Sequence, residues 1–145
     1  MKIPDDFKEF LNLLNDHGVK YLLVGGYVVS YYGYPRPTGD MDVWIRVDAE
    51  NASRTADVLS EFGFAADGVK ELLLKEFQII RMGLPPFRIE VSTYIDGVNF
   101  DDCYDEREVA DFDGVQVNLL SLRHLKINKL ASGRHKDLND LENLP

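Results

Sequence analysis

The sequence predicts an α/β (α+β) protein in which a mixed central β-sheet is flanked by helices. Two features of the hydrophobic pattern predict this class. Segments with helical spacing of apolar residues alternate with short apolar runs that are typical of buried strands. Elements that alternate in this way pack most simply as one sheet with helices against it. For 145 residues we expect one domain over 1–145, with a C-terminal helical segment at about 121–143.

The first half of the chain reads as three helices separated by two strands. Pro4 and the acids after it favour a helix start, because acidic side chains suit the N-terminal end of a helix. Gly18 favours the end of that helix, and Gly25-Gly26 favours a turn from strand to helix. The expected elements are a helix from Asp5 to His17, a strand at 19–24, a helix at about 26–33, a strand at 41–47 and a helix at about 49–62 capped by Asp48 or Asn51.

The second half begins with a hairpin and ends with helices. A turn of glycine and prolines at 83–86 separates two alternating segments. Asp113-Gly114 favours the start of a short strand, and Ser121 favours the start of a helix. The expected elements are strands at 77–82, 87–92 and 115–119 and helices at about 121–131 and 135–143. The remaining stretches are a connection at 64–70, a helix or strand at 72–74, and an acidic, irregular segment at 100–112.

The charge balance limits the classes of partner. The chain has 16 basic and 25 acidic residues and a formal net charge of −9. Non-specific nucleic-acid binding needs a basic surface that displaces counterions, so we do not expect it. The single cysteine, Cys103, has no partner for an internal disulfide and no candidate base close to it in the sequence. We therefore expect an ordinary thiol in a reducing compartment.

No segment predicts targeting to or insertion in a membrane. The N-terminal residues lack a basic region followed by an apolar run of about 7–15 residues, so we expect no signal peptide. The longest apolar stretch, 21–32, is interrupted by glycines and is shorter than the roughly 20 residues that a membrane-spanning helix needs. We therefore expect a cytoplasmic protein without membrane contact.

Two carboxylates alternate into an apolar strand at Asp40-Met41-Asp42. In a strand, residues i and i+2 point to the same face and lie roughly 6.5–7 Å apart. Two like charges at this spacing are costly unless a cation lies between them or one carboxylate takes up a proton. Mg²⁺ prefers oxygen ligands and binds through one or two carboxylates together with water and substrate phosphates. The motif therefore predicts a Mg²⁺ site.

The order of glycines and acids resembles the nucleotidyltransferase superfamily, which has the polymerase-β-like fold. In that family a strand ends in Gly-Gly or Gly-Ser, a helix follows, and an Asp-x-Asp strand comes next. Here thirteen residues separate Gly26 from Asp40. The segment 34–40 and the C-terminal pattern from Lys129 to Leu141 are similar to the small MNT and AbiEii-like branch. The resemblance covers most of the chain.

The resemblance implies a Mg²⁺-dependent transfer of NMP from an NTP to an acceptor hydroxyl, with up to two metal ions. Asp40 and Asp42 would be the catalytic metal ligands. Alternatively, they are only solvent-exposed residues at the entry to a strand. The family usually adds a third carboxylate on a nearby strand, and the matching position here is Glu90. Relatives more often have Asp there, and the alternative for Glu90 is a solvated strand residue.

The resemblance also implies a set of nucleotide-binding residues. The backbone of Gly25 and Gly26 would approach a phosphate, and Arg36 and Thr38 lie just before the acids. Alternatively the glycines only join strand to helix, and the arginine is solvated. At the C-terminus the implied phosphate contacts are Lys129 and Lys136, supported by an ion-pair network of Arg134, Asp137 and Asp140. The alternative is a solvated basic face that also includes Arg123 and Lys126, and His17, His124 and His135 show no metal-ligand spacing.

The sequence leaves the acceptor open among a protein, an RNA end and a small molecule such as an aminoglycoside. Small members of the branch resemble antitoxins that modify a HEPN-type toxin. The acidic charge disfavours a tRNA acceptor unless the cations of 121–136 contact it, whereas an acidic cleft would attract a cationic acceptor. A second hypothesis is a non-catalytic, antitoxin-like module that binds a partner protein. A third is a metal-dependent phosphohydrolase.

Overall fold

One six-stranded sheet forms the centre of the computed structural model, which describes residues 1–145 and confirms the predicted fold class. The helices are α1 (Asp5–Asp16), α2 (Gly26–Tyr31), α3 (Ala49–Phe62), α4 (Val69–Leu72), α5 (Phe100–Asp105), α6 (Leu122–Ser132) and α7 (His135–Asn143). The strands are β1 (Tyr21–Val24), β2 (Met41–Ile45), β3 (Ile79–Met82), β4 (Ile89–Ser92), β5 (Glu108–Phe112) and β6 (Val115–Leu119).

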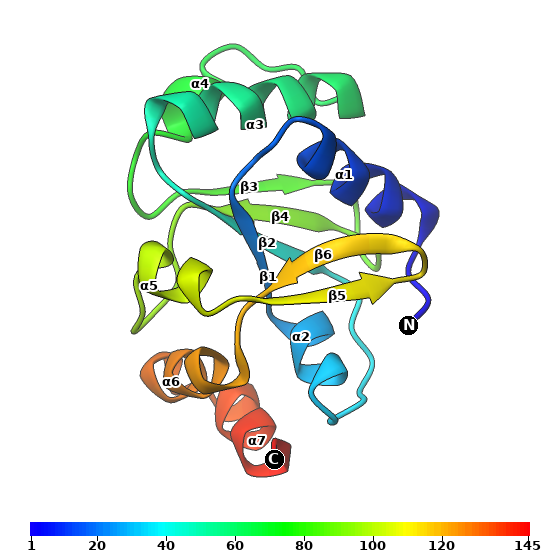
Figure 1. Cartoon of the computed structure of the whole chain (residues 1–145), viewed down its shortest axis with the longest axis vertical. Coiled ribbons are helices and arrows are strands. Elements are labelled where there is room, and N and C mark those ends of the chain that lie inside the picture. Colours follow the sequence, from blue (N-terminus) through cyan, green and yellow to red (C-terminus); the bar gives the residue numbers. More distant parts are fainter.

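The strand order is β3-β4-β2-β1-β6-β5, and the sheet is mixed (Figure 1). β1 and β2 are antiparallel, whereas β2 pairs with β4 and β1 pairs with β6 in parallel. An antiparallel hairpin closes each edge. All four residues of β1 are buried, as expected for a central strand covered on both faces.

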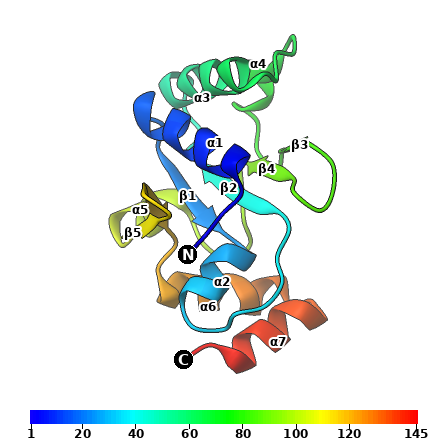
Figure 2. The ribbon, with the colours of Figure 1, turned by 90° about the vertical axis from the view of Figure 1, so that its right-hand side faces the viewer.

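The helices gather at the two ends of the sheet. α1, α3 and α4 lie together at one end, and α6 and α7 lie at the opposite end, beyond the point where β1 leads into α2 (Figures 1 and 2). The apolar stripe of α1 is fully buried, which explains the helical spacing of Phe7, Phe10, Leu11 and Leu14. No helix combines the length and the apolar character that a bilayer crossing requires.

The prediction of an irregular segment at 100–112 was wrong, because this segment forms α5 and β5. Asn99 caps α5, with its side chain accepting a hydrogen bond from the backbone N–H of Asp102. β5 is an edge strand whose first residues are exposed, so it lacks the apolar run of a buried strand. Asp113 and Gly114 both have positive φ, at 56° and 88°, and form the two-residue turn between β5 and β6.

Other differences concern element boundaries. The predicted connection at 64–70 and the undecided segment 72–74 contain the short helix α4, which follows Gly68 at a φ of +80°. The strand expected from Phe77 begins only at Ile79, since Phe77 itself has a φ of 58°. Asp48, one of the two predicted caps, is the N-cap of α3 and accepts a hydrogen bond from the Asn51 backbone. The side-chain amide of Asn51 instead donates to the carbonyl oxygens of Lys20 and Arg46.

Candidate active site

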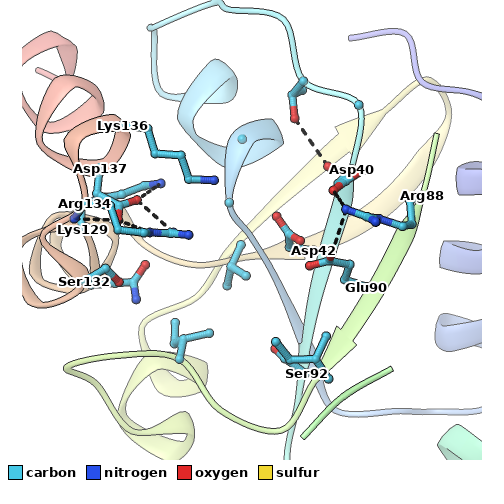
Figure 3. A pocket seen from close by; sticks show the side chains of 18 of the residues that line it. Asp40, Asp42, Arg88, Glu90, Ser92, Lys129, Ser132, Arg134, Lys136 and Asp137 are labelled. Carbon is cyan, nitrogen blue, oxygen red and sulfur yellow. Dashed lines mark hydrogen bonds and ion pairs between the residues drawn. The ribbon is translucent and has the colours of Figure 1, made fainter. Parts of the chain in front are cut away.

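A polar cleft of about 850 Å³ lies between the carboxylate-bearing strands of the sheet and the two C-terminal helices. Figure 3 shows carboxylates of β2 and β4 on one side and cationic side chains of α6 and α7 on the other. The charged lining is mixed, with six basic and five acidic side chains in a chain whose net charge is −9. They are Arg36, Arg81, Arg88, Lys129, Arg134, Lys136, Asp40, Asp42, Glu90, Asp96 and Asp137. The cleft is therefore not the acidic one that would attract a cationic acceptor.

Three carboxylates share one face of the sheet because of strand alternation and register. Asp40 and Asp42 are two residues apart at the start of β2, so their side chains point to the same face. Asp42 is directly opposite Glu90 in the parallel pairing of β2 with β4. A carboxylate distant in sequence thus lies beside the Asp-x-Asp motif.

Burial and neighbouring carboxylates favour the protonated form of Asp42. Burial raises the pKa of Asp42 to about 7, and the neighbouring charges of Glu90 and Asp40 act in the same direction. Lys136 acts in the opposite direction, and its side chain extends into the cleft from the side opposite these acids (Figure 3). Burial, rather than a net excess of negative charge in the cleft, is therefore the main cause of the raised pKa.

Arg88 binds these carboxylates most closely. Its Nη2 lies 2.9 Å from Asp40 Oδ2 and 3.4 Å from Glu90 Oε1. Arg81, on the edge strand β3, also contacts Glu90 Oε1, at 3.0 Å, but its side chain is 55% exposed against 29% for Arg88. Arg88 was not among the site residues predicted from the sequence. The signal was present, because Arg88 precedes Glu90 by two residues in an alternating segment and so points to the same face.

A buried ion-pair network holds the opposite wall. Lys129 Nζ lies 3.2 Å from Asp137 Oδ1 and 3.0 Å from Asp140 Oδ2, and all three side chains are at most 6% exposed. The Arg36 guanidinium forms a bidentate pair with Asp140, at 2.8 and 2.9 Å. Arg134 pairs with Asp137. The network therefore joins α6, α7 and the loop before β2, which carries Arg36.

Comparisons with known proteins fit this arrangement. No protein-family model and no curated protein sequence matched the chain. Among solved structures, the chain is similar to a candidate nucleotidyltransferase from Thermotoga maritima, with a TM-score of 0.61 and 16% identity over 94% of this chain and 88% of that one. It has the nucleotidyltransferase fold.

Two other nucleotidyltransferase-fold structures are similar to the chain. One is an antigenic nucleotidyltransferase-like protein from Paracoccidioides brasiliensis, with a TM-score of 0.57 and 18% identity over 94% of this chain and 72% of that one. The other is the lincosamide antibiotic adenylyltransferase LnuA with lincomycin bound, with a TM-score of 0.56 and 15% identity over 97% and 95% of the two chains. At these identities the likeness establishes the fold.

In this nucleotidyltransferase fold, every residue that the sequence singled out for catalysis or nucleotide binding lines the same cleft. They are Asp40, Asp42, Glu90, Gly25, Gly26, Arg36, Thr38, Lys129 and Lys136. The cationic residues of this set differ in how far their charge is already paired within the protein. Lys129 and Arg36 are engaged by the buried acids of α7, whereas Lys136 has no ion-pair or hydrogen-bond partner in the protein and points into the cleft (Figure 3). Lys136 is therefore the cation most available to an anionic ligand.

The alternative interpretation, a solvated basic face on α6, is not a continuous surface of free cations. Arg123 pairs with Glu106, Lys126 contacts the carbonyl oxygen of Pro145, and Lys129 turns into the buried network. Cys103, expected to be an ordinary thiol, is buried, and burial raises its pKa to about 12. Its reactive thiolate form is therefore scarce near neutral pH.

The donor chemistry of the cleft fits a hard divalent cation. Three carboxylates lie close together on adjacent strands, and the pKa of Asp42 is raised by burial and by the charges of Glu90 and Asp40, which a bound cation would offset. The side chains as they stand are not gathered into a cage of three or more His, Cys, Asp or Glu ligands. Mg²⁺ does not need such a cage, because one or two carboxylates, water and substrate phosphates complete its octahedral shell.

Gly25 is required by both its backbone conformation and its closeness to Asp42. Its φ is +77°, and a Cβ atom added there would lie 2.2 Å from Asp42 Oδ2. We expect Gly25→Ala to displace Asp42 and to lower the free energy of unfolding by about 2–3 kcal/mol. Gly33→Ala is the matched control, since Gly33 has a φ of +116° but an added Cβ atom would have no neighbour within 4 Å. Urea unfolding of both variants checks this, and equal losses would show that the contact with Asp42 contributes nothing.

Proposed function

We propose that this protein is a Mg²⁺-dependent nucleotidyltransferase that moves NMP from an NTP to an acceptor hydroxyl and releases pyrophosphate. The observation that carries the proposal is the meeting of Asp40, Asp42 and Glu90 on one face of a cleft, opposite the unpaired Lys136. Carboxylates that hold divalent ions beside a cationic wall suit a polyphosphate substrate. The likeness to nucleotidyltransferase-fold structures, one of them an adenylyltransferase, supports the same activity.

Each residue has a separate task in this proposal. Asp40, Asp42 and Glu90 would hold one or two Mg²⁺ ions, which orient the triphosphate and neutralise its charge. Lys136 would bind a phosphate oxygen directly. Gly25 and Gly26 allow the triphosphate to approach the backbone, since neither has a side chain that would narrow the cleft.

The ion-pair network would hold other parts of the site in place and would not itself contact the substrate. Lys129 and Arg36 are saturated by buried carboxylates, so they hold the loop of Arg36 and Thr38 against α7. Thr38 in turn packs against Gly26, where an added Cβ atom would lie 2.4 Å from Thr38 Oγ1. We therefore propose a supporting role for Lys129 and Arg36 in shaping the nucleotide site.

The acceptor is proposed to bind beside β3 and β4. Ile79, Tyr94 and Ile95 line this part of the cleft and offer apolar surface next to Glu90. LnuA, whose structure contains lincomycin, supports a small-molecule acceptor as the first class to test. The resemblance of 34–40 and 129–141 to the small MNT and AbiEii-like branch supports a HEPN-type toxin as the second class, and an RNA end is the third.

Calorimetric titration of the protein with each of the four NTPs, with and without Mg²⁺, tests the proposal. We expect at least one NTP to bind only when Mg²⁺ is present. A folded protein that binds none of the four would contradict the proposal. Analysis of the products then separates transfer, which releases pyrophosphate, from a phosphohydrolase, which releases phosphate or nucleoside diphosphate without an acceptor.

A non-catalytic, partner-binding module is the second candidate function. It is favoured by the exposed apolar side chains of the β3–β4 turn, where Leu84 is 83% and Phe87 58% exposed. This turn contacts the carboxylate motif, because a Cβ atom on Gly39 would lie 2.0 Å from the Pro86 carbonyl oxygen. Mg²⁺-dependent nucleotide binding that requires Asp42 would contradict a purely non-catalytic module.

Lys136→Ala is expected to weaken NTP binding about tenfold with little effect on stability. The Lys136 ammonium is exposed and has no protein partner, so its loss removes a charge-assisted contact to phosphate and leaves no buried group unpaired. Lys70→Ala is the control, because Lys70 is exposed on α4 at the opposite end of the molecule (Figure 2). Calorimetry with Mg²⁺ and NTP measures both dissociation constants. Equal NTP affinities for the two variants would show that Lys136 does not bind the nucleotide.

A further inference from the structure

Arg88 and a divalent cation would compete for the same oxygen atoms. Arg88 Nη2 contacts Asp40 Oδ2 at 2.9 Å and Glu90 Oε1 at 3.4 Å, so a single guanidinium nitrogen bridges the first and third carboxylates of the site (Figure 3). A metal ion bound by these carboxylates would need the space and the oxygen lone pairs that Arg88 uses. A cation held by these two oxygen atoms would therefore displace the guanidinium from them.

The guanidinium of Arg88 is incompletely satisfied where it lies. Its Nε is buried and has no hydrogen-bond partner. A buried, unpaired donor is unfavourable, and it is unusual in a side chain that is otherwise so closely paired. The side chain also lines the cleft and is 29% exposed, so the guanidinium has open space beside it. A second position in which Nε is paired would remove this cost.

We infer that Arg88 is a resident counter-ion of the carboxylates that releases Asp40 and Glu90 to the divalent cation and pairs instead with the polyphosphate. The planar fork of a guanidinium matches two phosphate oxygens, and the cleft that Arg88 lines is the one in which the polyphosphate is proposed to bind. The inference rests on the proposed nucleotidyl transfer. In this inference Arg88 neutralises the carboxylates when the site is empty and binds phosphate when the divalent cation and the NTP are bound.

This role predicts opposite changes in two affinities. With Arg88→Ala, Mn²⁺ alone should bind about three- to tenfold tighter, because its competitor is gone. In saturating Mn²⁺, the NTP should bind about tenfold more weakly, because a phosphate contact is lost. If Arg88 had only a structural role, its loss would weaken the binding of Mn²⁺ and of NTP alike. Arg88→Lys keeps the charge but not the fork, so it should restore most of the competition with Mn²⁺ and little of the NTP affinity.

Arg81→Ala is the matched control, since Arg81 contacts Glu90 but not Asp40. Its Mn²⁺ affinity should rise clearly less than that of Arg88→Ala, and its NTP affinity should fall clearly less. Thermal unfolding gives a readout independent of the nucleotide. In EDTA, Arg88→Ala should unfold at a lower temperature than wild type, and saturating Mn²⁺ should abolish this difference, because the metal replaces the guanidinium as the counter-ion.

The outcomes distinguish this inference from the proposed function. Mn²⁺ and NTP binding that depends on Asp42 but is unchanged or uniformly weakened by Arg88→Ala would overturn the role of Arg88 and leave the transferase proposal intact. A wild-type protein that binds neither Mn²⁺ nor NTP would overturn the transferase proposal and, with it, this inference. Tighter Mn²⁺ binding together with weaker NTP binding in Arg88→Ala, with both changes clearly smaller in Arg81→Ala, is the expected result.

Discussion

Asp42→Asn is expected to lower nucleotidyl transfer by about a thousandfold or more and to abolish Mg²⁺-dependent NTP binding. The substitution keeps the size of the side chain but removes a charge that would hold the proposed metal ion. Metal ions supply several kcal/mol of charge stabilisation in such reactions, and each 1.4 kcal/mol corresponds to about tenfold in rate. Asp67→Asn is the control for the loss of one negative charge, because Asp67 is exposed and does not line the cleft.

The same substitution should stabilise the protein in EDTA at pH 8. The pKa of Asp42 is raised to about 7, so the folded protein binds a proton here more tightly than the unfolded chain does. Wild-type stability attributable to this group therefore falls as the pH rises from about 4 to about 7, and the full cost is present above pH 7. Asparagine carries no charge and avoids this cost.

Thermal unfolding at pH 5.5 and pH 8 checks the direction of this pH dependence of stability. The melting temperature of Asp42→Asn should exceed that of wild type by more at pH 8 than at pH 5.5. A variant that loses NTP binding but is destabilised at both pH values would show that Asp42 supports the fold, and its functional loss would then not report on metal binding. A variant that retains Mg²⁺-dependent NTP binding would contradict the proposed metal site.

Lys129→Met is expected to lower the free energy of unfolding by about 3 kcal/mol. Lys129 is buried between Asp137 and Asp140, and removing one partner of a buried ion pair leaves uncompensated charge in a poorly solvated place. Arg134 and Arg36 still neutralise part of that charge, which keeps the loss near the lower end of the range for such substitutions. Methionine preserves the volume of the side chain, so the loss reports on charge rather than on a cavity.

Urea unfolding of Lys129→Met, with Lys126→Met as the control on the same helix, measures this loss. Lys126 contacts only the Pro145 carbonyl oxygen near the surface, so its replacement should cost less than about 1 kcal/mol. Equal effects for the two variants would mean that the network contributes no more than a surface contact.

The pH dependence of the network has the opposite sign to that of Asp42. Burial tends to raise the pKa of Asp137, but Arg134 and Lys129 hold it below its usual value. The stability contributed by a carboxylate with a lowered pKa is present above about pH 4 and is lost as the pH falls through the pKa of the folded state. The difference in the free energy of unfolding between wild type and Lys129→Met should therefore become smaller at acidic pH.

The sequence by itself determined the main elements of the sheet and the local geometry of the Asp-x-Asp motif. Periodicity identified buried elements such as β1 and α1, because burial on one or both faces leaves a regular apolar pattern. It did not identify β5, because an edge strand is partly exposed and its pattern is mixed. Asp40 and Asp42 could be assigned to one face because strand alternation depends only on neighbouring residues.

Only the tertiary structure decided which distant residues meet these carboxylates. The register between β2 and β4 brings Glu90 opposite Asp42, and no local pattern specifies a register between strands. Folding also turns Lys129 towards buried acids and leaves Lys136 free in the cleft, although both are lysines of the same C-terminal segment. The physical reason is that burial and pairing, which decide whether a charge supports the fold or meets a ligand, depend on neighbours that are far apart in the chain.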